Sequence, residues 1–187
     1  MYGIAGRLRD GIAPPCRTLV CALTIAGLGA SIGVASSGTA ALAASSQDRS
    51  FLHTALQDDA DFRTLSNLAM QKIKNAKVRE FAQSISQQTD SADNVLMRDA
   101  KRDDVKPPGT LSPRASDQYG RIQAQSGPDA ADEFLRDVAI DARISAYDYS
   151  SEAQAGRSPS LKRLASRRAA ELDRLAKEAD SLRRGSK

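Results

Sequence analysis

The sequence is poor in the side chains that most enzymes use for chemistry. Its 187 residues include two cysteines, one histidine and no tryptophan. Both cysteines, Cys16 and Cys21, precede residue 44, so the rest of the chain has no thiol for a disulfide, a metal site or a nucleophile. With His53 as the single histidine, nucleophilic catalysis also lacks its usual base. No phosphate loop, dinucleotide fingerprint, zinc spacing or Gly-x-Ser-x-Gly motif occurs. We therefore expect a protein that is not an enzyme and carries no cofactor.

An uncharged stretch near the amino terminus is typical of a signal for export. Residues 18–47 contain no charge, three arginines precede them, and Ala41–Ala43 fits the small-x-small pattern that comes before a cleavage site. We expect a signal peptide over residues 1–43 and a periplasmic or secreted domain over residues 44–187. The alternative is an inner-membrane anchor through residues 18–35, although the strongly apolar part, about 16 residues, is shorter than the roughly 20 that a spanning helix needs.

Charge is distributed unevenly over the rest of the chain. Residues 157–187 hold ten Lys and Arg against four Asp and Glu, whereas residues 44–156 hold 14 against 18. The carboxyl-terminal segment is therefore a basic element attached to a mildly acidic body.

Apolar residues recur at every third or fourth position, which predicts helices and no strands. We expect four long helices and one short helix, over about residues 51–73, 76–103, 130–155, 159–182 and 114–125. The predicted N-caps of the long helices are Ser50, Asn75, Asp129 and Ser158. This pattern indicates an all-α protein, a four-helix bundle with one extra short helix.

Polar side chains interrupt the apolar faces of three of these helices. Gln88 falls on the inner face of the second helix, Asp141 on that of the fourth and Arg168 on that of the last. If the three meet at one level, they form a buried polar layer. Arg168 must then pair with Asp141 or another carboxylate, because an unpaired buried charge is costly. The alternative is that the helices rotate slightly and these groups reach water.

Three segments resemble an exported bacterial family, domain of unknown function 4142. They are LAMQKIKNAKVREFAQ (68–83), ADEFLRDVAIDARISAY (131–147) and GRSPSLKRLASRRAAELDRLAKEA (156–179). The resemblance covers about residues 48–182. It implies a ferritin-like four-helix bundle, in a family without an established biochemical role.

The chain departs from the family where the family has histidines. The expected Asp-His pairs are replaced here by Gln87-Gln88 and Asp141-Ala142, and the position of a third histidine falls near Asp173 or Arg174. By this resemblance, Gln88 occupies the inward position of a polar, metal-binding histidine.

Metal binding is the alternative function, and its ligands would be carboxylates. A di-metal site in such a bundle usually has Glu-x-x-His pairs, and this sequence has none. A site formed by Asp61, Glu80 and Asp141 is conceivable for Mg, Ca or Mn. His53 is expected to face solvent, as is the acidic run at residues 58–61.

The last helix carries the clearest surface feature, which we call the basic stripe: Arg163, Arg167, Arg174, Lys177 and Arg184 share the face opposite its leucines. Such a stripe suits anionic envelope components or an acidic protein partner, and the alternative is a solvated face partly offset by acidic neighbours. Nucleic acid is not expected, because no aromatic stacking platform accompanies the charges. We therefore expect an exported, non-enzymatic protein that acts through its surface at the cell envelope.

Overall fold

The computed structural model describes residues 45–185, and this range is all-α. The helices are α1 (Ser46–Lys72), α2 (Ala76–Arg102), α3 (Pro113–Ala124), α4 (Gly127–Ala155) and α5 (Pro159–Gly185). No strand occurs in this part of the chain, so the predicted all-α class, with four long helices and one short one, is confirmed. The expected signal peptide, its cleavage after Ala43 and the alternative anchor through residues 18–35 lie outside the described residues.

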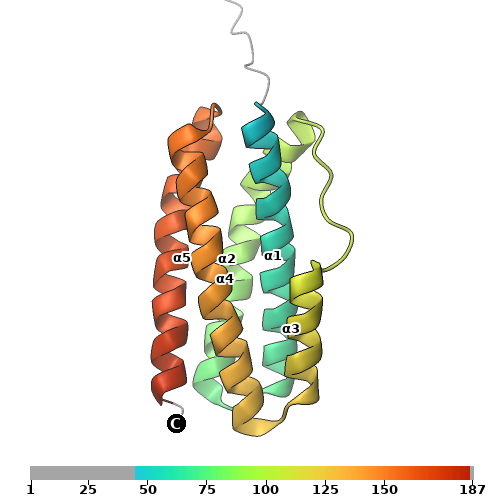
Figure 1. Ribbon diagram of the computed structural model, residues 1–187, viewed down its shortest axis with the longest axis vertical. Coiled ribbons are helices and arrows are strands. Elements are labelled where there is room, and N and C mark those ends of the chain that lie inside the picture. Colours follow the sequence, from blue (N-terminus) through green and yellow to red (C-terminus); the bar gives the residue numbers. More distant parts are fainter. Residues whose placement is uncertain (1–44, 186–187) are drawn as a thin grey trace, which may run out of the picture. The chain divides into compact units, whose positions relative to one another are not determined.

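Figure 1 shows the four long helices as two antiparallel hairpins, α1 with α2 and α4 with α5. Between the hairpins, α1 packs on α4 and α2 packs on α5. The loop after α2 returns along the outside of the bundle to α3, which packs on α1 and α4. Consequently α2 and α4 run in the same direction, and a single long connection links the two hairpins.

The core is built from the apolar faces of all five helices. It contains two aromatic contacts, an edge-to-face pair of Phe51 and Tyr149 at 4.9 Å between ring centres and a second pair of Phe81 and Phe134 at 6.5 Å. The largest fully buried aliphatic residues include Leu52, Leu65, Ile85, Leu96, Ile122, Leu135, Leu161 and Leu172. Along each long helix, buried apolar side chains recur mostly at the spacing of three and four that the sequence displays, so the predicted helical pattern is confirmed.

Two of the four predicted N-caps are confirmed. The Asn75 side chain accepts a hydrogen bond from the backbone N–H of Val78 at the start of α2. The Ser158 hydroxyl accepts one from the backbone N–H of Leu161, 3.4 Å away, at the start of α5. Each side chain satisfies a donor that the first helical turn leaves free.

The predicted caps of the other two long helices are wrong. Ser45 caps α1 in a reciprocal capping box with Asp48, so Ser50 lies inside the helix. Helix α4 begins at Gly127, and Asp129 belongs to its first turn. The φ angle of Gly127 is 56°, a conformation that glycine adopts without strain.

Candidate functional site

The predicted polar layer of Gln88, Asp141 and Arg168 does not form. Gln88 is exposed, and the buried polar residue at this level of α2 is Thr89, whose Oγ1 donates to the carbonyl oxygen of Ile85 at 2.9 Å. A hydroxyl can be satisfied on its own helix in this way, whereas a buried amide needs partners elsewhere. The helix is therefore rotated so that Thr89 faces the core and Gln88 lies at the surface.

Arg168 is buried, as its place in an apolar run predicts, and it pairs with carboxylates other than Asp141. Its Nη2 lies 3.5 Å from Oδ1 of Asp59, and its Nη1 lies 3.3 Å from Oε2 of Glu171. Burial raises the pKa of Asp59, and the Arg168 guanidinium opposes that rise. Burial also raises the pKa of Tyr149, next to this pair, so the phenol keeps its proton. Helices α1, α4 and α5 thus share a buried charged cluster.

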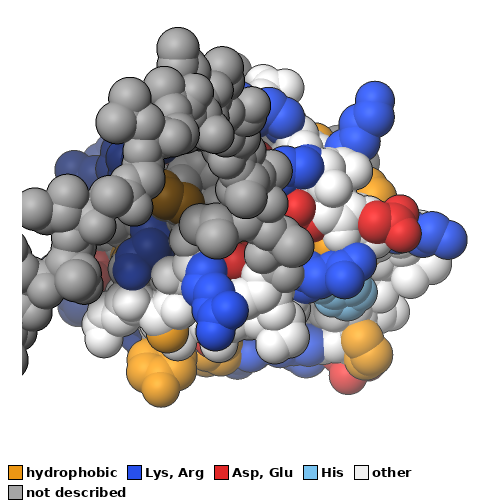
Figure 2. All heavy atoms as spheres, turned by 90° about the horizontal axis from the view of Figure 1, so that it is seen from above, with side chains coloured by type: hydrophobic (Ala, Val, Ile, Leu, Met, Phe, Trp, Pro, Cys, Tyr) orange, Lys and Arg blue, Asp and Glu red, His pale blue; other side chains and the backbone are white. Residues whose placement is uncertain are grey.

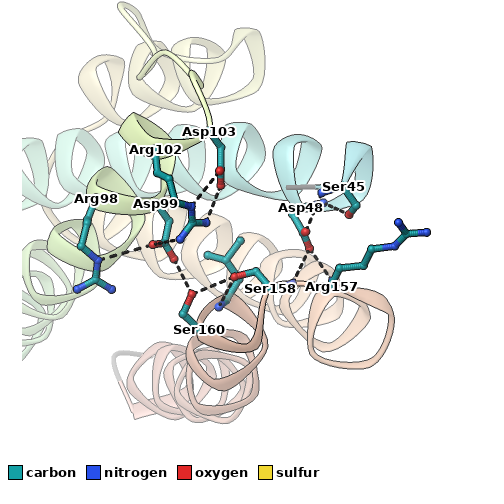
Figure 3. Close-up of polar contacts among 10 residues, drawn as sticks. Ser45, Asp48, Arg98, Asp99, Arg102, Asp103, Arg157, Ser158 and Ser160 are labelled. Carbon is teal, nitrogen blue, oxygen red and sulfur yellow. Dashed lines mark hydrogen bonds and ion pairs between the residues drawn. The ribbon is translucent and has the colours of Figure 1, made fainter. Parts of the chain in front are cut away.

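One carboxylate of α1 binds the turn between α4 and α5, as Figure 3 shows. Oδ1 of Asp48 accepts hydrogen bonds from the backbone N–H groups of Arg157 at 2.8 Å and Ser158 at 3.4 Å. Oδ2 of the same residue accepts from the backbone N–H of Ser45 at 2.9 Å. Asp48 therefore joins the start of α1 to the α4–α5 turn at one end of the bundle.

A second carboxylate joins the end of α2 to the start of α5 at the same end (Figure 3). Asp99 accepts from the hydroxyl of Ser160 at 3.1 Å and from Nη1 of Arg102 at 3.0 Å. Nε of Arg98 lies 3.6 Å from the same carboxylate, while 67% of the Arg98 side chain stays exposed. The network therefore places an exposed guanidinium at the junction of α2 and α5.

A hollow lies along this junction, and we call it the basic groove. Helices α2 and α5 pack less extensively on each other than the helices within either hairpin do. The groove has a volume of about 480 Å³, and its lining residues are Val95, Arg98, Ser160, Arg163, Leu164, Ser166 and Arg167. A neighbouring hollow of about 400 Å³ contains Gln88 and Arg174, but Glu171 and Glu178 line it as well. Of these two hollows, only the basic groove is lined by arginines without a lining carboxylate.

All five residues of the basic stripe are exposed, and none of them has an ion pair within residues 45–185. The other two arginines of α5 do have partners, because Arg168 binds Asp59 and Arg183 binds Asp132. Only Arg163 and Arg167 of the stripe line the basic groove. The sequence reasoning missed Arg98, because nothing in the pattern of α2 distinguishes it from other surface arginines.

Two of the three predicted metal ligands lie together, on the opposite side of the bundle. Asp61 and Asp141 line a cavity of about 70 Å³ between α1, α3 and α4, and Asp58 lines it too. Glu80 is exposed on α2 and does not reach it. Among the residues that the structure describes, no three His, Cys, Asp or Glu side chains are grouped to hold a metal ion.

The acidic run at residues 58–61 is more buried than predicted. Asp59 is 2% exposed, and Asp58 is half-buried, so the expectation of a solvated face is wrong for this run. Burial raises the pKa of Asp58 to about 6, against a hydrogen bond from Ser145 that lowers it. His53 is exposed, as predicted. A search of the described helices for one that is long and apolar enough to cross a membrane finds none.

These features define a helical-bundle domain with a basic groove along α2 and α5 and an acidic cavity on the opposite side. The sequence profile of the family named domain of unknown function DUF4142 matches residues 34–182. The chain therefore belongs to this family, and the resemblance drawn from the sequence is confirmed.

A solved structure shares the fold. The crystal structure of a DUF305 fragment from Deinococcus radiodurans superposes with a TM-score of 0.67, covering 74% of this chain and 96% of that one. At 16% sequence identity the similarity concerns the fold alone. Among curated proteins, no sequence matches this chain significantly.

Proposed function

We propose that this protein is a non-enzymatic component of the cell envelope that binds anionic phospholipid through the basic groove. One observation carries the proposal. Three exposed arginines from two helices, Arg98, Arg163 and Arg167, line one hollow that no carboxylate lines. Each cationic side chain near an anionic membrane surface contributes about 1 kcal/mol of binding free energy.

The other groups of the groove also suit a lipid phosphate. Guanidinium groups bind phosphate oxygens with two parallel hydrogen bonds, and the exposed hydroxyl of Ser166 adds a short donor. Val95 and Leu164 offer apolar surface to the glycerol and upper acyl carbons. Figure 2 looks onto the bundle end at which α1 begins and shows Lys and Arg side chains there beside hydrophobic and acidic ones.

This function requires export, which we propose on the strength of the uncharged residues 18–47 and the pattern Ala41–Ala43. The mature protein is then periplasmic or secreted, and an uncleaved inner-membrane anchor through residues 18–35 is the alternative. The intact mass of the exported protein distinguishes the two, because cleavage after Ala43 removes 43 residues.

We also propose a ferritin-like class for the bundle. The support is its connectivity, since a single long crossover between two helical hairpins is typical of ferritin-like folds. The functional alternative that such ancestry suggests, a divalent-metal or redox centre, has weaker support here. Of its predicted ligands Asp61, Glu80 and Asp141, the residue Glu80 stands apart on the exposed face of α2.

Vesicle sedimentation tests the proposed function. The exported protein is mixed with vesicles of phosphatidylglycerol and phosphatidylcholine, and with phosphatidylcholine alone. Replacing Arg98, Arg163 and Arg167 together by Gln should weaken binding to the anionic vesicles by on the order of 100-fold, because about 3 kcal/mol of attraction is lost. Raising the salt concentration should weaken the unmodified protein's binding in the same direction.

A matched control removes the same charge elsewhere. Lys74, Lys77 and Arg79 are exposed, have no ion pair in the described part of the chain and lie near the start of α2, at the other end of the bundle. Replacing these three by Gln should change binding less than threefold. Equal losses in the two triple variants would mean that net charge alone drives the binding, and the groove would then have no specific role.

A further inference from the structure

The cavity between α1, α3 and α4 has more hydrogen-bond acceptors than donors. Asp58 receives one donor, the Ser145 hydroxyl, on Oδ2 at 2.6 Å. Asp61 receives two, from Gln57 and from the backbone of Ser112, both on Oδ1. The other oxygen of each carboxylate, Oδ1 of Asp58 and Oδ2 of Asp61, has no donor within residues 45–185.

A third acceptor in the cavity wall is buried and has no donor either. Gln118 is 2% exposed and lines the cavity. Its Nε2 donates to Oδ2 of Asp141 at 2.7 Å, which fixes the orientation of the amide. Its Oε1 is left buried without a partner. A buried acceptor without a donor is costly, and a bound group that donates a hydrogen bond to it removes that cost.

The charge of the cavity also calls for a cation. Three carboxylates, Asp58, Asp61 and Asp141, face one guanidinium, that of Arg114, which pairs with Asp141. Burial raises the pKa of Asp58 and of Asp141, as expected for carboxylates that are only partly compensated.

We infer that this cavity binds a primary alkylammonium group. An ammonium has three N–H donors, and the cavity residues offer three unmatched acceptors, Oδ1 of Asp58, Oδ2 of Asp61 and Oε1 of Gln118. This site is independent of the proposed lipid binding, because it is formed by different helices and takes a ligand of opposite charge.

Size and lining limit the ligand further. The space of about 70 Å³ is roughly half of a cavity that holds benzene, so it admits an ammonium with a short alkyl chain. Phe62, Leu65 and Ile144 form the apolar part of the wall, and they would contact the alkyl carbons. A free short-chain amine and the end of a lysine side chain share this chemistry.

Titration of the exported protein with n-propylammonium chloride, followed by amide NMR shifts, tests the inference. We expect saturable shifts at residues of the cavity wall. Tetramethylammonium, a cation without N–H donors, should bind at least tenfold more weakly, and 1-butanol should not bind. A lysine with blocked backbone groups presents the same ammonium on a peptide. Tighter binding of the blocked lysine than of propylammonium would identify a side chain as the source of the ligand.

Variants connect the binding to the named acceptors. Asp58→Asn and Gln118→Met, each checked for helicity, should raise the propylammonium dissociation constant at least tenfold. Asp148→Asn is the matched control, since this half-buried aspartate of α4 is close enough to raise the pKa of Asp58 but lines no part of the cavity. It should change the constant less than twofold.

Three outcomes would overturn the inference. Equal binding of propylammonium and tetramethylammonium would show that charge alone matters. If Asp148→Asn and Asp58→Asn raised the propylammonium dissociation constant equally, the amine would not bind in the cavity. Displacement of the amine by micromolar Mn²⁺ would reassign the cavity as a metal site. The vesicle-binding result for the triple variant of the basic groove affects none of these outcomes. The two proposals can therefore be contradicted independently of each other.

Discussion

Two buried carboxyl groups of this bundle are compensated in different ways. Asp59 of α1 is 2% exposed and faces a cation, the Arg168 guanidinium at 3.5 Å. Glu152 of α4 is fully buried, forms no ion pair among the described residues and faces the carboxyl group of Asp48. The pKa of both groups is raised to about 7, mainly by burial, but of the two only Asp59 has an ion pair that opposes the rise.

The carboxyl groups of Asp48 and Glu152 share one proton, and they differ in how strongly they hold it. Burial, the hydrogen bond with Asp48 and the charge of Asp48 together raise the pKa of Glu152 to about 7. Burial acts on Asp48 in the same direction, but backbone hydrogen bonds from Ser45 and Arg157 outweigh it and lower the pKa of Asp48. Asp48 therefore keeps the charge and Glu152 keeps the proton. A protonated Glu152 can donate to Asp48, which gives a partner to one of the two otherwise unmatched carboxyl oxygens of Glu152.

The comparison predicts that losing the cation is the most damaging change. Arg168→Met leaves Asp59 without its charge partner and should lower the free energy of unfolding by about 3–5 kcal/mol at pH 8. Below pH 5 the loss should be smaller, because Asp59 can then take up a proton. Chemical denaturation at the two pH values measures both. Arg167→Met, the exposed neighbour, should stay within about 0.5 kcal/mol of the unmodified protein.

Arg168 also shows how far the sequence determines such a site. Its position between Ala165 and Leu172 on an apolar helix face correctly predicts burial. Its partner could not be predicted in the same way. Neighbouring positions on a helix differ by about 100° in direction, so a small rotation decides whether Asp58, Asp59 or Asp61 turns inward.

The groove and the buried glutamate differ in how well the sequence could have revealed them. The width of the gap between α2 and α5 depends on packing between segments far apart in the chain, and no local pattern encodes it. Glu152, in contrast, follows Ser145 and Tyr149 at helical spacings of four and three, on the buried face of α4. That spacing indicates a buried carboxyl group at residue 152, which was not among the predicted polar positions.

The second prediction concerns the proton on Glu152. Its pKa is about 7 in the folded state and 4.5 as an ordinary glutamate. Because the folded-state pKa is the higher one, this group's contribution to stability is fully present below pH 4.5 and is lost as the pH rises through 7. The total change is about 3 kcal/mol.

Glu152→Gln isolates this contribution, because glutamine resembles the protonated acid and cannot lose a proton. The variant should match the unmodified protein at about pH 4.5 and be about 3 kcal/mol more stable at pH 8. Thermal and urea denaturation across this range provide the comparison. The exposed Glu178→Gln should leave the pH profile unchanged. Parallel profiles for Glu152→Gln and the unmodified protein would show that Glu152 does not hold a proton at neutral pH.

A third prediction tests whether the Glu152 carboxyl group must stay in place. A Cβ atom on Gly156 would lie 2.3 Å from Oε1 of Glu152 and 2.6 Å from its carbonyl oxygen, so Gly156→Ala forces both groups to move. We expect a loss of about 2 kcal/mol in the free energy of unfolding, together with a flatter pH profile. Gly120→Ala is the matched control within α3, because nothing lies within 4 Å of its added Cβ. It should be neutral or stabilising by up to about 1 kcal/mol.

The smallest expected effect separates a helix cap from the carboxyl pair beside it. Ser45→Ala and Ser112→Ala each remove a hydroxyl that caps a helix, α1 in the first case and α3 in the second, so each should cost about 1 kcal/mol. Only the Ser45 hydroxyl also lowers the pKa of Asp48. Without that hydroxyl the pKa of Asp48 rises toward that of Glu152, and the two carboxyl groups share the proton more equally. The Ser45→Ala variant should therefore lose stability at a different pH from the unmodified protein, whereas Ser112→Ala should lose the same amount at every pH. If both variants give parallel profiles, the cap stabilises α1 without tuning the carboxyl pair.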